Sequence, residues 1–131
     1  MSQLSDTPTI AMVDDDESVR IAMADMVESF GYKVVAFASG AEVLGSDRLH
    51  DVACLITDVR MSGMTGFELH DRLIAAGRMI PTIFLTAFPQ EKGKNRARKA
   101  GAVCYLSKPC QRVDLLACLH SALAQVGGKG R

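Results

Sequence analysis

The sequence predicts an α/β domain in which helices cover both faces of a single parallel sheet. Short apolar segments alternate five times with amphipathic helical segments, and this alternation is typical of doubly wound folds. Most of these short segments are apolar almost throughout, as expected for strands that are covered on both faces. With 131 residues, the chain has the length of one domain with one core.

Strands are expected at residues 9–13, 33–37, 53–57, 82–86 and 103–106. The second strand begins with Lys33, and a charged residue there favours an edge of the sheet. The first and third strands are then expected to be neighbours. The segments that follow these two strands should therefore meet at one edge of the sheet.

Helical spacing and capping residues define the segments between the strands. The first helix is expected to end at Gly31 and to bury a stripe of Val19, Met23, Met26, Val27 and Phe30. Ser39 is expected to cap a second helix that ends near residue 46. Thr65 is expected to cap a third helix that ends near residue 77.

The fourth helix is unusual because residues 92–100 contain five cations and only small apolar side chains. Gly93 costs about 1 kcal/mol relative to alanine in a helix, and the like charges repel one another. We expect this helix to be the least stable one in the domain. Its basic face is interpreted as a solvated surface, with a docking surface for an acidic partner as the alternative.

The last helix is expected over residues 111–125. Its apolar stripe should consist of Val113, Leu116, Leu119 and Leu123. Gly127 and Gly128 should end it.

Composition and charge exclude several classes of protein. Hydrophobic residues make up 48% and charged residues 23%, and the formal net charge is zero, which argues against a protein that coats nucleic acid or a membrane surface. No apolar stretch approaches the roughly 20 residues that span a bilayer. The first residues lack the basic start and apolar middle of a secretory signal, so a cytoplasmic location is expected.

The cysteines and histidines are not expected to form a site. The cysteines contain no C-x-x-C pair and are expected to act as small apolar residues, without a disulfide bond or zinc: Cys54, Cys104, Cys110 and Cys118. The histidines lack a partner pattern and are expected at the surface or its boundary: His50, His70 and His120.

Acidic residues follow two of the expected strands and indicate a functional site. Asp14, Asp15 and Asp16 follow the first strand, and Asp58 follows the third. In a parallel sheet these residues converge on the crevice beyond the carboxyl ends of the strands. Several anions in one crevice require a cation, because like-charge repulsion otherwise raises a carboxyl pKa. Hard oxygen ligands around a partly hydrated site favour Mg²⁺.

The same edge of the sheet holds groups suited to phosphoryl transfer. An ionised Asp58 is a nucleophile that forms an aspartyl phosphate. Thr86 ends the fourth strand and supplies a hydroxyl group, and Lys108 follows the fifth strand and supplies an ammonium group. A metal, a fixed ammonium and a hydroxyl donor together hold the oxygens of a transferring phosphoryl group.

Four motifs resemble, in order, those of bacterial two-component response regulator receiver domains, the CheY-like superfamily. They are Val13-Asp14-Asp15-Asp16, Thr57-Asp58-Val59-Arg60-Met61, Leu85-Thr86-Ala87 and Ser107-Lys108-Pro109. The resemblance implies a flavodoxin-like (βα)5 fold with strand order 2-1-3-4-5 over residues 9–125, flanked by tails at 1–8 and 126–131. The Val59-Arg60-Met61 run is similar to the FixJ-like branch, which includes nitrogen-fixation regulators.

The resemblance also implies roles for single residues. Asp58 would accept a phosphoryl group from a sensor histidine kinase or a histidine phosphotransfer protein. Asp15 would bind Mg²⁺ directly, Asp14 would act mainly through metal-bound water, and the Arg60 backbone carbonyl would complete the metal site. The domain would catalyse only its own phosphorylation and dephosphorylation.

The remaining implied roles concern the response to phosphorylation. Lys108 would contact the phosphoryl group through its ammonium, Thr86 would donate its hydroxyl to that group, and the Lys108–Pro109 bond would be cis. Tyr105 matches the switch aromatic. Movement of Thr86 and Tyr105 would alter the surface of the fourth helix, fifth strand and fifth helix, through which an unknown output partner is controlled.

Two positions depart from the commonest pattern of the family. Ser62 stands where receivers usually have proline, so the loop after Asp58 is expected to be looser. Phe88 stands two residues after Thr86, where polar residues are frequent. Phe88 and Arg60 flank the expected path of attacking water, so they bear on the lifetime of the phosphorylated form.

Other classes of protein fit these residues less well. A haloacid-dehalogenase-type phosphatase needs a second acid two residues after Asp58, and Arg60 stands there. A flavodoxin-like cofactor binder needs a phosphate-binding loop after the first strand, and Asp14 to Asp16 would repel phosphate. His70 as a phosphohistidine does not suit an alternating α/β pattern. A stand-alone regulator is favoured, and the alternative is a receiver excised from a DNA-binding regulator, the one case that involves nucleic acid.

Overall fold

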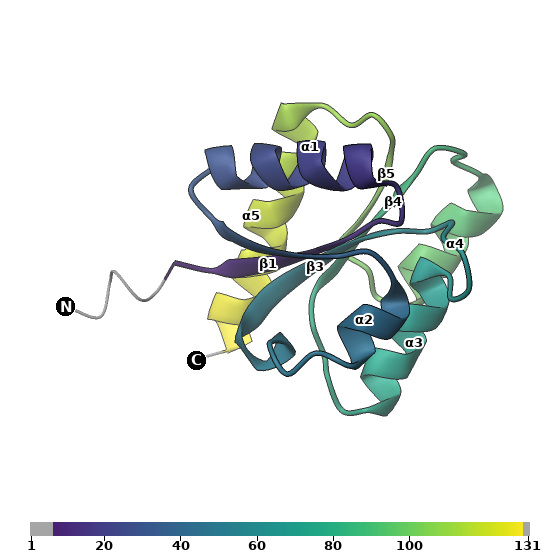
Figure 1. Cartoon of the computed structure of the whole chain (residues 1–131), viewed down its shortest axis with the longest axis horizontal. Helices are drawn as coiled ribbons and strands as arrows, with labels where there is room; N and C mark the ends of the chain where they lie inside the picture. Colours follow the sequence, from purple (N-terminus) through teal and green to yellow (C-terminus); the bar gives the residue numbers. More distant parts are fainter. Residues whose placement is uncertain (1–6, 130–131) are drawn as a thin grey trace.

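A five-stranded parallel sheet forms the centre of the domain, and its strand order is β2-β1-β3-β4-β5 (Figure 1). The computed structural model describes residues 7–129, so the tail expected at 1–8 lies mostly outside the described residues. The strands are β1 Thr9–Val13, β2 Lys33–Phe37, β3 Val52–Asp58, β4 Thr82–Thr86 and β5 Cys104–Ser107. The expected fold is confirmed, including the neighbouring first and third strands and the edge position of the strand that begins with Lys33.

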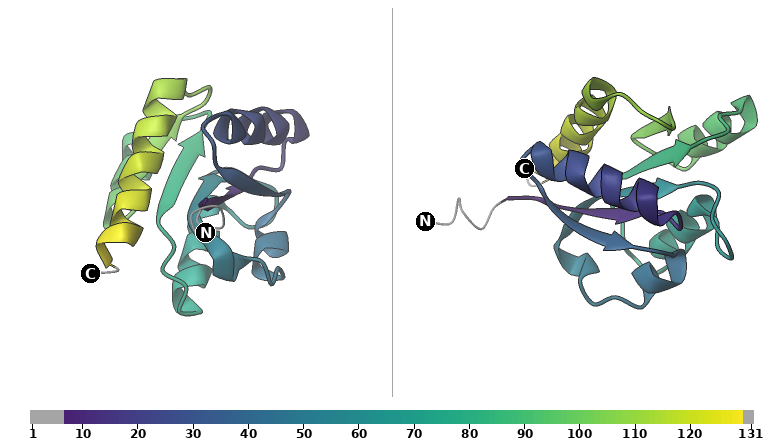
Figure 2. Two further views of the ribbon diagram at one scale, coloured as in Figure 1. Left: turned by 90° about the vertical axis from the view of Figure 1, so that its left-hand side faces the viewer. Right: turned by 45° about the horizontal axis from the view of Figure 1, so that its top comes forward.

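Helices cover both faces of the sheet. They are α1 Glu17–Ser29, α2 Gly40–Leu44, α3 Gly66–Ala75, α4 Glu91–Lys99 and α5 Arg112–Lys129, with a 3-10 turn, η2, at Leu49–Asp51. Helices α1 and α5 pack on one face, and α2, α3 and α4 lie on the other (Figures 1 and 2). Within residues 7–129 no helix has both the length and the apolar character needed to cross a bilayer.

Polar side chains begin three of these helices. The Asp16 carboxylate accepts a hydrogen bond from the backbone N–H of Val19 at 3.1 Å and caps α1. Ser39 caps α2, and Thr65 caps α3 in a reciprocal capping box with Glu68. The expected caps at Ser39 and Thr65 are therefore confirmed. Asp16 therefore has a structural role as the cap of α1, which distinguishes it from Asp14 and Asp15.

Two main apolar clusters hold the layers together. The cluster under α1 and α5 includes Ile10, Met12, Met23, Val27, Ile56, Leu85, Leu115 and Leu119. The cluster under α2 and α3 includes Val13, Val35, Phe37, Val43, Leu55, Leu69 and Leu73. Both clusters contain residues of the central strands β1 and β3, because these strands are covered on both faces.

The expected apolar stripe of α5 was partly wrong. Val113 is 70% exposed, whereas Leu115, Cys118, Leu119 and Ala122 are buried. The face of α5 that is rotated by one or two residues from the expected one also consists of apolar side chains. Periodicity alone therefore did not show which of these two faces is buried. The expected end at Gly127 and Gly128 was also wrong, because α5 continues to Lys129; glycine costs about 1 kcal/mol in a helix but does not forbid one.

His70 is more buried than expected. It lies on α3 with 6% of its surface exposed, and its ring meets the edge of Phe84 at a centroid distance of 5.7 Å. Among the residues that the structure describes, no group hydrogen-bonds to its Nδ1 atom. Burial lowers the pKa of His70, although the nearby charge of Asp71 acts in the opposite direction.

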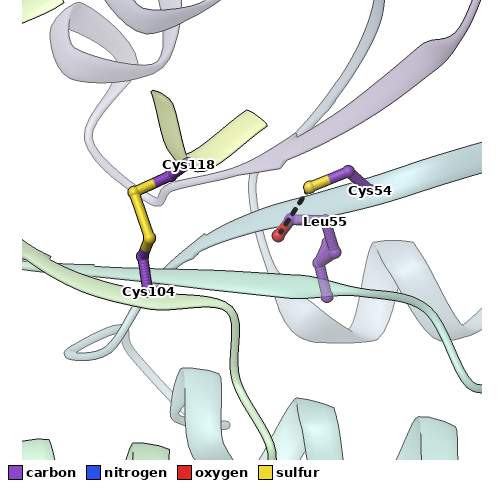
Figure 3. The surroundings of a disulfide bond; sticks show 4 residues. All are labelled: Cys54, Leu55, Cys104 and Cys118. Atoms are coloured by element: carbon purple, nitrogen blue, oxygen red, sulfur yellow. Dashed lines mark hydrogen bonds between the residues drawn. A yellow bond between two sulfur atoms is a disulfide. The ribbon is translucent and has the colours of Figure 1, made fainter. Parts of the chain in front are cut away.

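A disulfide bond joins Cys104 of β5 to Cys118 of α5 (Figure 3). The expectation that none of the cysteines forms a disulfide was therefore wrong. These two cysteines are 14 residues apart in the sequence, and they meet because α5 packs against the edge strand that precedes it. Cys54 and Cys110 are free, and burial raises the pKa of the Cys54 thiol to about 12.

Candidate functional site

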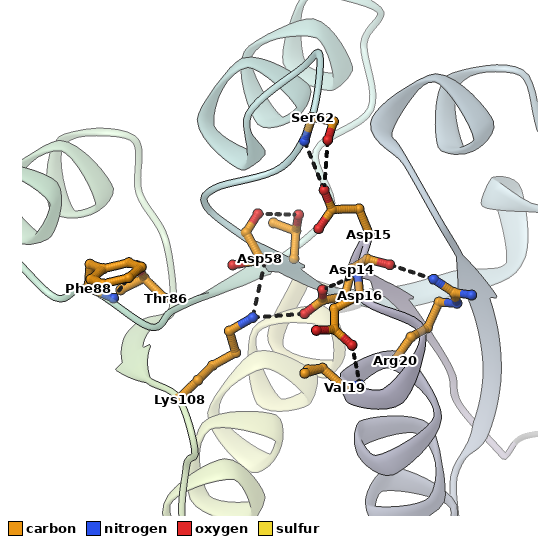
Figure 4. Close-up of polar contacts among 11 residues, drawn as sticks. Asp14, Asp15, Asp16, Val19, Arg20, Asp58, Ser62, Thr86, Phe88 and Lys108 are labelled. Atoms are coloured by element: carbon orange, nitrogen blue, oxygen red, sulfur yellow. Dashed lines mark hydrogen bonds and ion pairs between the residues drawn. The ribbon is translucent and has the colours of Figure 1, made fainter.

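The carboxyl ends of four neighbouring strands bring the expected site residues to one edge of the sheet. Asp14 follows β1, Asp58 ends β3, Thr86 ends β4 and Lys108 follows β5 (Figure 4). The strands are parallel and adjacent, so their carboxyl ends open on the same crevice. Residues that lie up to 94 positions apart in the sequence therefore interact directly.

Three carboxylates form a compact cluster in this crevice. One oxygen atom from each of Asp14, Asp15 and Asp58 lies within 4.8 Å of the others. Asp14 is fully buried and Asp58 is 5% exposed, whereas Asp15 faces solvent. A set of oxygen ligands that is open to water on one side fits a hard, partly hydrated divalent cation such as Mg²⁺.

Lys108 bridges the two buried carboxylates. Its Nζ atom lies 3.0 Å from Asp14 Oδ2 and 3.2 Å from Asp58 Oδ2 (Figure 4). The peptide bond between Lys108 and Pro109 is cis, as the resemblance implied. The ammonium group therefore lies inside the acidic cluster, between two of its members.

Burial and mutual interaction shift the pKa values of Asp58 and Lys108. Burial raises the pKa of Asp58, the charge of Asp14 raises it further, and Lys108 opposes both effects. Burial lowers the pKa of Lys108, but its contacts with Asp14 and Asp58 outweigh burial, so that the pKa is raised. The ammonium group consequently stays charged beside Asp58.

The loops around the cluster are held by contacts that the sequence did not indicate. Arg20 donates a hydrogen bond from its guanidinium to the backbone carbonyl of Asp14 at 2.8 Å. Gly66, the first residue of α3, lies against the backbone carbonyl of Asp58, where a Cβ atom would collide. Only glycine allows α3 to begin this close to the end of β3. The available signal in the sequence was the glycine itself, which directly follows the expected cap Thr65.

Ser62 makes a second contact that the sequence did not indicate. Its backbone N–H and its hydroxyl group both donate hydrogen bonds to Asp15 Oδ2, at 2.9 Å and 3.2 Å (Figure 4). A proline at this position has neither donor. The looser loop was expected from the backbone rigidity that proline would add, whereas the contact with Asp15 depends on the two donors that serine contributes.

An aromatic residue and a cation contact each other beside Thr86. The Arg60 guanidinium stacks over the Phe88 ring at 4.9 Å from the ring centroid. Phe88 is 60% exposed, and its backbone N–H donates a hydrogen bond to the Thr86 hydroxyl at 3.1 Å (Figure 4). Arg60 and Phe88 thus form a pair that connects the loops after β3 and β4.

Tyr105 lies on β5 beside α4, away from the acidic cluster. Its hydroxyl accepts a hydrogen bond from the backbone N–H of Gln90 at 3.3 Å. A cavity of about 200 Å³ lies next to the ring, and its lining includes Thr86, Phe88, Gly93 and Tyr105. This cavity therefore links the end of β4 to the surface formed by α4 and β5.

Comparison with known proteins identifies the class to which this fold and site belong. A family model described as the response regulator receiver domain matches residues 10–120. The chain belongs to this family and is a receiver domain of two-component response regulators.

Similar proteins agree with this assignment. The response regulator protein TmoT of Ectopseudomonas mendocina is 36% identical over 114 residues, which cover 87% of this chain and 52% of TmoT. The transcriptional regulatory protein FixJ of Azorhizobium caulinodans is 33% identical over 122 residues, which cover 93% of this chain and 58% of FixJ. The chain thus spans about half the length of the curated relatives it matches.

The fold is likewise that of solved response regulators. The structure of the response regulator StyR superimposes with a TM-score of 0.86 at 36% identity, over 94% of this chain and 62% of StyR. The similarity therefore extends over nearly all of this chain.

Proposed function

We propose that Asp58 accepts a phosphoryl group from the phosphohistidine of a sensor histidine kinase or a histidine phosphotransfer protein. The observation that carries this proposal is the clustering of Asp14, Asp15 and Asp58 around one crevice, with Lys108 bonded to two of them. The crevice offers a nucleophile, a fixed ammonium and a set of cation ligands, which are the groups that phosphoryl transfer requires.

In the transfer, a carboxylate oxygen of Asp58 forms a bond to phosphorus while the bond between phosphorus and the donor's imidazole nitrogen breaks. The electron pair of the broken bond stays with the imidazole, which takes a proton from solvent as it leaves. Lys108 remains within reach of the new phosphoryl oxygens because it is anchored to Asp14. Thr86, at the end of the adjacent strand, donates its hydroxyl to the same oxygens.

The donor set supports a divalent cation in this reaction. Mg²⁺ would be held by Asp14, Asp15, Asp58 and the backbone carbonyl of Arg60, and it would neutralise the charge that the carboxylate and the phosphoryl oxygens share. The domain acts on no other substrate in this proposal: its chemistry is its own phosphorylation and dephosphorylation. A cytoplasmic location belongs to the same proposal, since the phosphohistidine donor is made from ATP.

The cavity between β4 and α4 supports a route from the site to the surface. Thr86 and Tyr105 both line it, so movement of Thr86 toward a phosphoryl group leaves space into which the Tyr105 ring turns. The α4-β5-α5 surface would change with the ring and control an output partner. All five cations of α4 are exposed: Lys92, Lys94, Arg96, Arg98 and Lys99. Arg96 contacts α3, where its guanidinium lies 4.7 Å from the centre of the Phe67 ring and 3.6 Å from an Asp71 carboxylate oxygen.

A second candidate concerns the protein of which this domain is a part. The chain spans about half of FixJ, which is named a transcriptional regulatory protein. This observation favours the receiver of a DNA-binding transcriptional regulator over the stand-alone regulator. In that case a separate domain would contact nucleic acid, and the α4-β5-α5 surface would control that domain.

Mass spectrometry after incubation with acetyl phosphate and Mg²⁺ tests the phosphoacceptor. The wild-type domain should gain the mass of one phosphoryl group, and Asp58→Ala should gain none. Asp25→Ala, which removes an exposed acid on α1, is the matched control and should be labelled like wild type. Equal labelling of Asp58→Ala would overturn the assignment.

Removal of the metal tests the acidic cluster. Chelation should abolish labelling, because the anionic crevice then repels the anionic donor. Asp15→Ala should have the same effect in the presence of Mg²⁺. Labelling that continues in the chelator would refute the proposed metal dependence.

A further inference from the structure

The contact between Ser62 and Asp15 connects two loops that follow different strands. Asp15 belongs to the loop between β1 and α1, and Ser62 belongs to the loop between β3 and α3. Ser62 donates both its backbone N–H and its hydroxyl to Asp15 Oδ2, at 2.9 Å and 3.2 Å. Figure 4 shows Ser62 above the crevice, with both donors directed at this single carboxylate.

The geometry restricts the orientation of Asp15. Both residues are exposed, so packing does not fix the Asp15 side chain, and an unrestrained carboxylate would populate several rotamers. Two donors on one oxygen select a single orientation, since hydrogen bonds to an ionised acceptor are the stronger ones. In this orientation a carboxylate oxygen of Asp15 lies within 4.8 Å of oxygens of Asp14 and Asp58.

We propose that Ser62 is a positioning residue that sets the affinity of this domain for Mg²⁺. It orients the exposed ligand Asp15 and ties it to the loop that carries Arg60, whose carbonyl belongs to the proposed metal site. Hydrogen-bond partners of metal ligands change metal affinity by about 10- to 100-fold when they are removed. The inference rests on the proposed function, because it assumes that Asp15 is a ligand.

The substitution series separates the two donors of Ser62. Ser62→Thr keeps the N–H and the hydroxyl, Ser62→Ala keeps only the N–H, and Ser62→Pro removes both. Isothermal titration with MgCl₂, without a phosphoryl donor, measures the affinity of each variant. We expect Ser62→Pro to bind about tenfold more weakly or worse, Ser62→Ala to be intermediate and Ser62→Thr to resemble wild type.

A matched control removes the hydroxyl of a serine that lies outside the proposed metal site. Ser46 accepts a hydrogen bond from the Arg48 backbone N–H at 3.0 Å, in the loop after α2. Ser46→Ala should bind Mg²⁺ like wild type. Thermal unfolding of every variant identifies a loss of fold, and if Ser62→Pro does not fold, Ser62→Ala and Ser62→Thr decide the question.

Amide NMR provides a second readout that does not depend on activity. The Ser62 amide signal should shift on addition of Mg²⁺ in wild type, and Asp15→Asn should remove most of this response. Equal affinities across the Ser62 series, with wild type binding Mg²⁺ normally, would overturn the inference alone. Tighter binding by Ser62→Ala would also overturn it, because Ser62 would then compete with the metal. Absence of Mg²⁺ binding in wild type would instead overturn the proposed function.

Discussion

Gly93 of α4 lies directly against the Tyr105 hydroxyl, so closely that a Cβ atom at this position would overlap the oxygen. Glycine costs about 1 kcal/mol relative to alanine inside a helix. The Tyr105 side chain occupies the space that a side chain at position 93 would need, which explains why a glycine stands inside this helix. Tyr105 and α4 fit together only because the helix lacks a side chain at this turn.

Replacement of Gly93 by alanine should displace the Tyr105 ring. The new methyl group meets the far end of a flexible side chain, so we expect the ring to move, the hydrogen bond from Gln90 to be lost, and α4 to gain up to about 1 kcal/mol of helix propensity. NMR signals of the Tyr105 ring measure the change. Tyr32, the other of the two tyrosines, is an internal control, and unchanged Tyr105 signals would contradict the prediction.

Loss of the Arg60–Phe88 pair should shorten the lifetime of the phosphorylated domain. Arg60 and Phe88 flank the path of attacking water that the family resemblance implies, and an exposed cation–π contact is worth about 0.5–1 kcal/mol. Hydrolysis should therefore accelerate about two- to fivefold in Phe88→Ala or Arg60→Ala. Loss of label after removal of the donor gives the rate, and Arg60→Ala retains the backbone carbonyl of the metal site.

The double variant provides the control for this pair. If the two side chains act together, Arg60→Ala/Phe88→Ala should hydrolyse no faster than the quicker single variant. Fully additive effects, or single variants with wild-type lifetimes, would show that the pair does not shield the site.

Burial of His70 should make the domain less stable in mild acid. Its pKa is lower in the folded state than in the unfolded chain, so the unfolded chain binds more protons between these two values. Stability should therefore fall as the pH drops below about 6.5, by at most about 1.4 kcal/mol per pH unit, and level off below the folded-state pKa. Urea unfolding as a function of pH measures this slope.

Two histidine variants separate this effect from general acid denaturation. His70→Gln should flatten the slope in this pH range, because it removes the buried titrating group. His50→Gln, at an exposed position, should leave the slope as it is in wild type. Identical slopes in wild type and His70→Gln would assign the pH dependence to other groups.

The bond between Cys104 and Cys118 should stabilise the oxidised domain. A closed loop of about 15 residues corresponds to about 3 kcal/mol in the chain-entropy description. Dithiothreitol should lower the free energy of unfolding by roughly this amount, whereas Cys104→Ser/Cys118→Ser should not respond. Protein purified without reductant and then unfolded should expose two titratable thiols, those of Cys54 and Cys110; four thiols would contradict the bond.

The location of the site could be predicted from the sequence because it follows from topology. Alternating strands and helices require parallel strands, and parallel strands place Asp58, Thr86 and Lys108 at one edge. The residues at this edge are set by where each strand ends, and those ends were predicted to within one residue. The order and direction of the strands in the sheet thus determine which of these side chains meet.

Contacts between loops and between helix faces could not be predicted in the same way. Ser62 meets Asp15 because of the path of one irregular loop, which no periodicity describes. Cys118 meets Cys104 because α5 turns Leu115 and Leu119 inward, a choice that apolar spacing left open. Along a helix each residue turns by about 100°, so an error of one position rotates the expected buried stripe of α5 by more than a quarter of a turn.

Lys108 gives the acidic crevice a permanent counter-ion of its own. The carboxylates of Asp14 and Asp58 share a tethered positive charge that is present at any concentration of free divalent ions. Lys108 thus offsets part of the negative charge of the clustered acids without a metal. This cation is covalently attached, whereas the divalent cation of the proposed function would be exchangeable and would supply the charge that phosphoryl transfer needs.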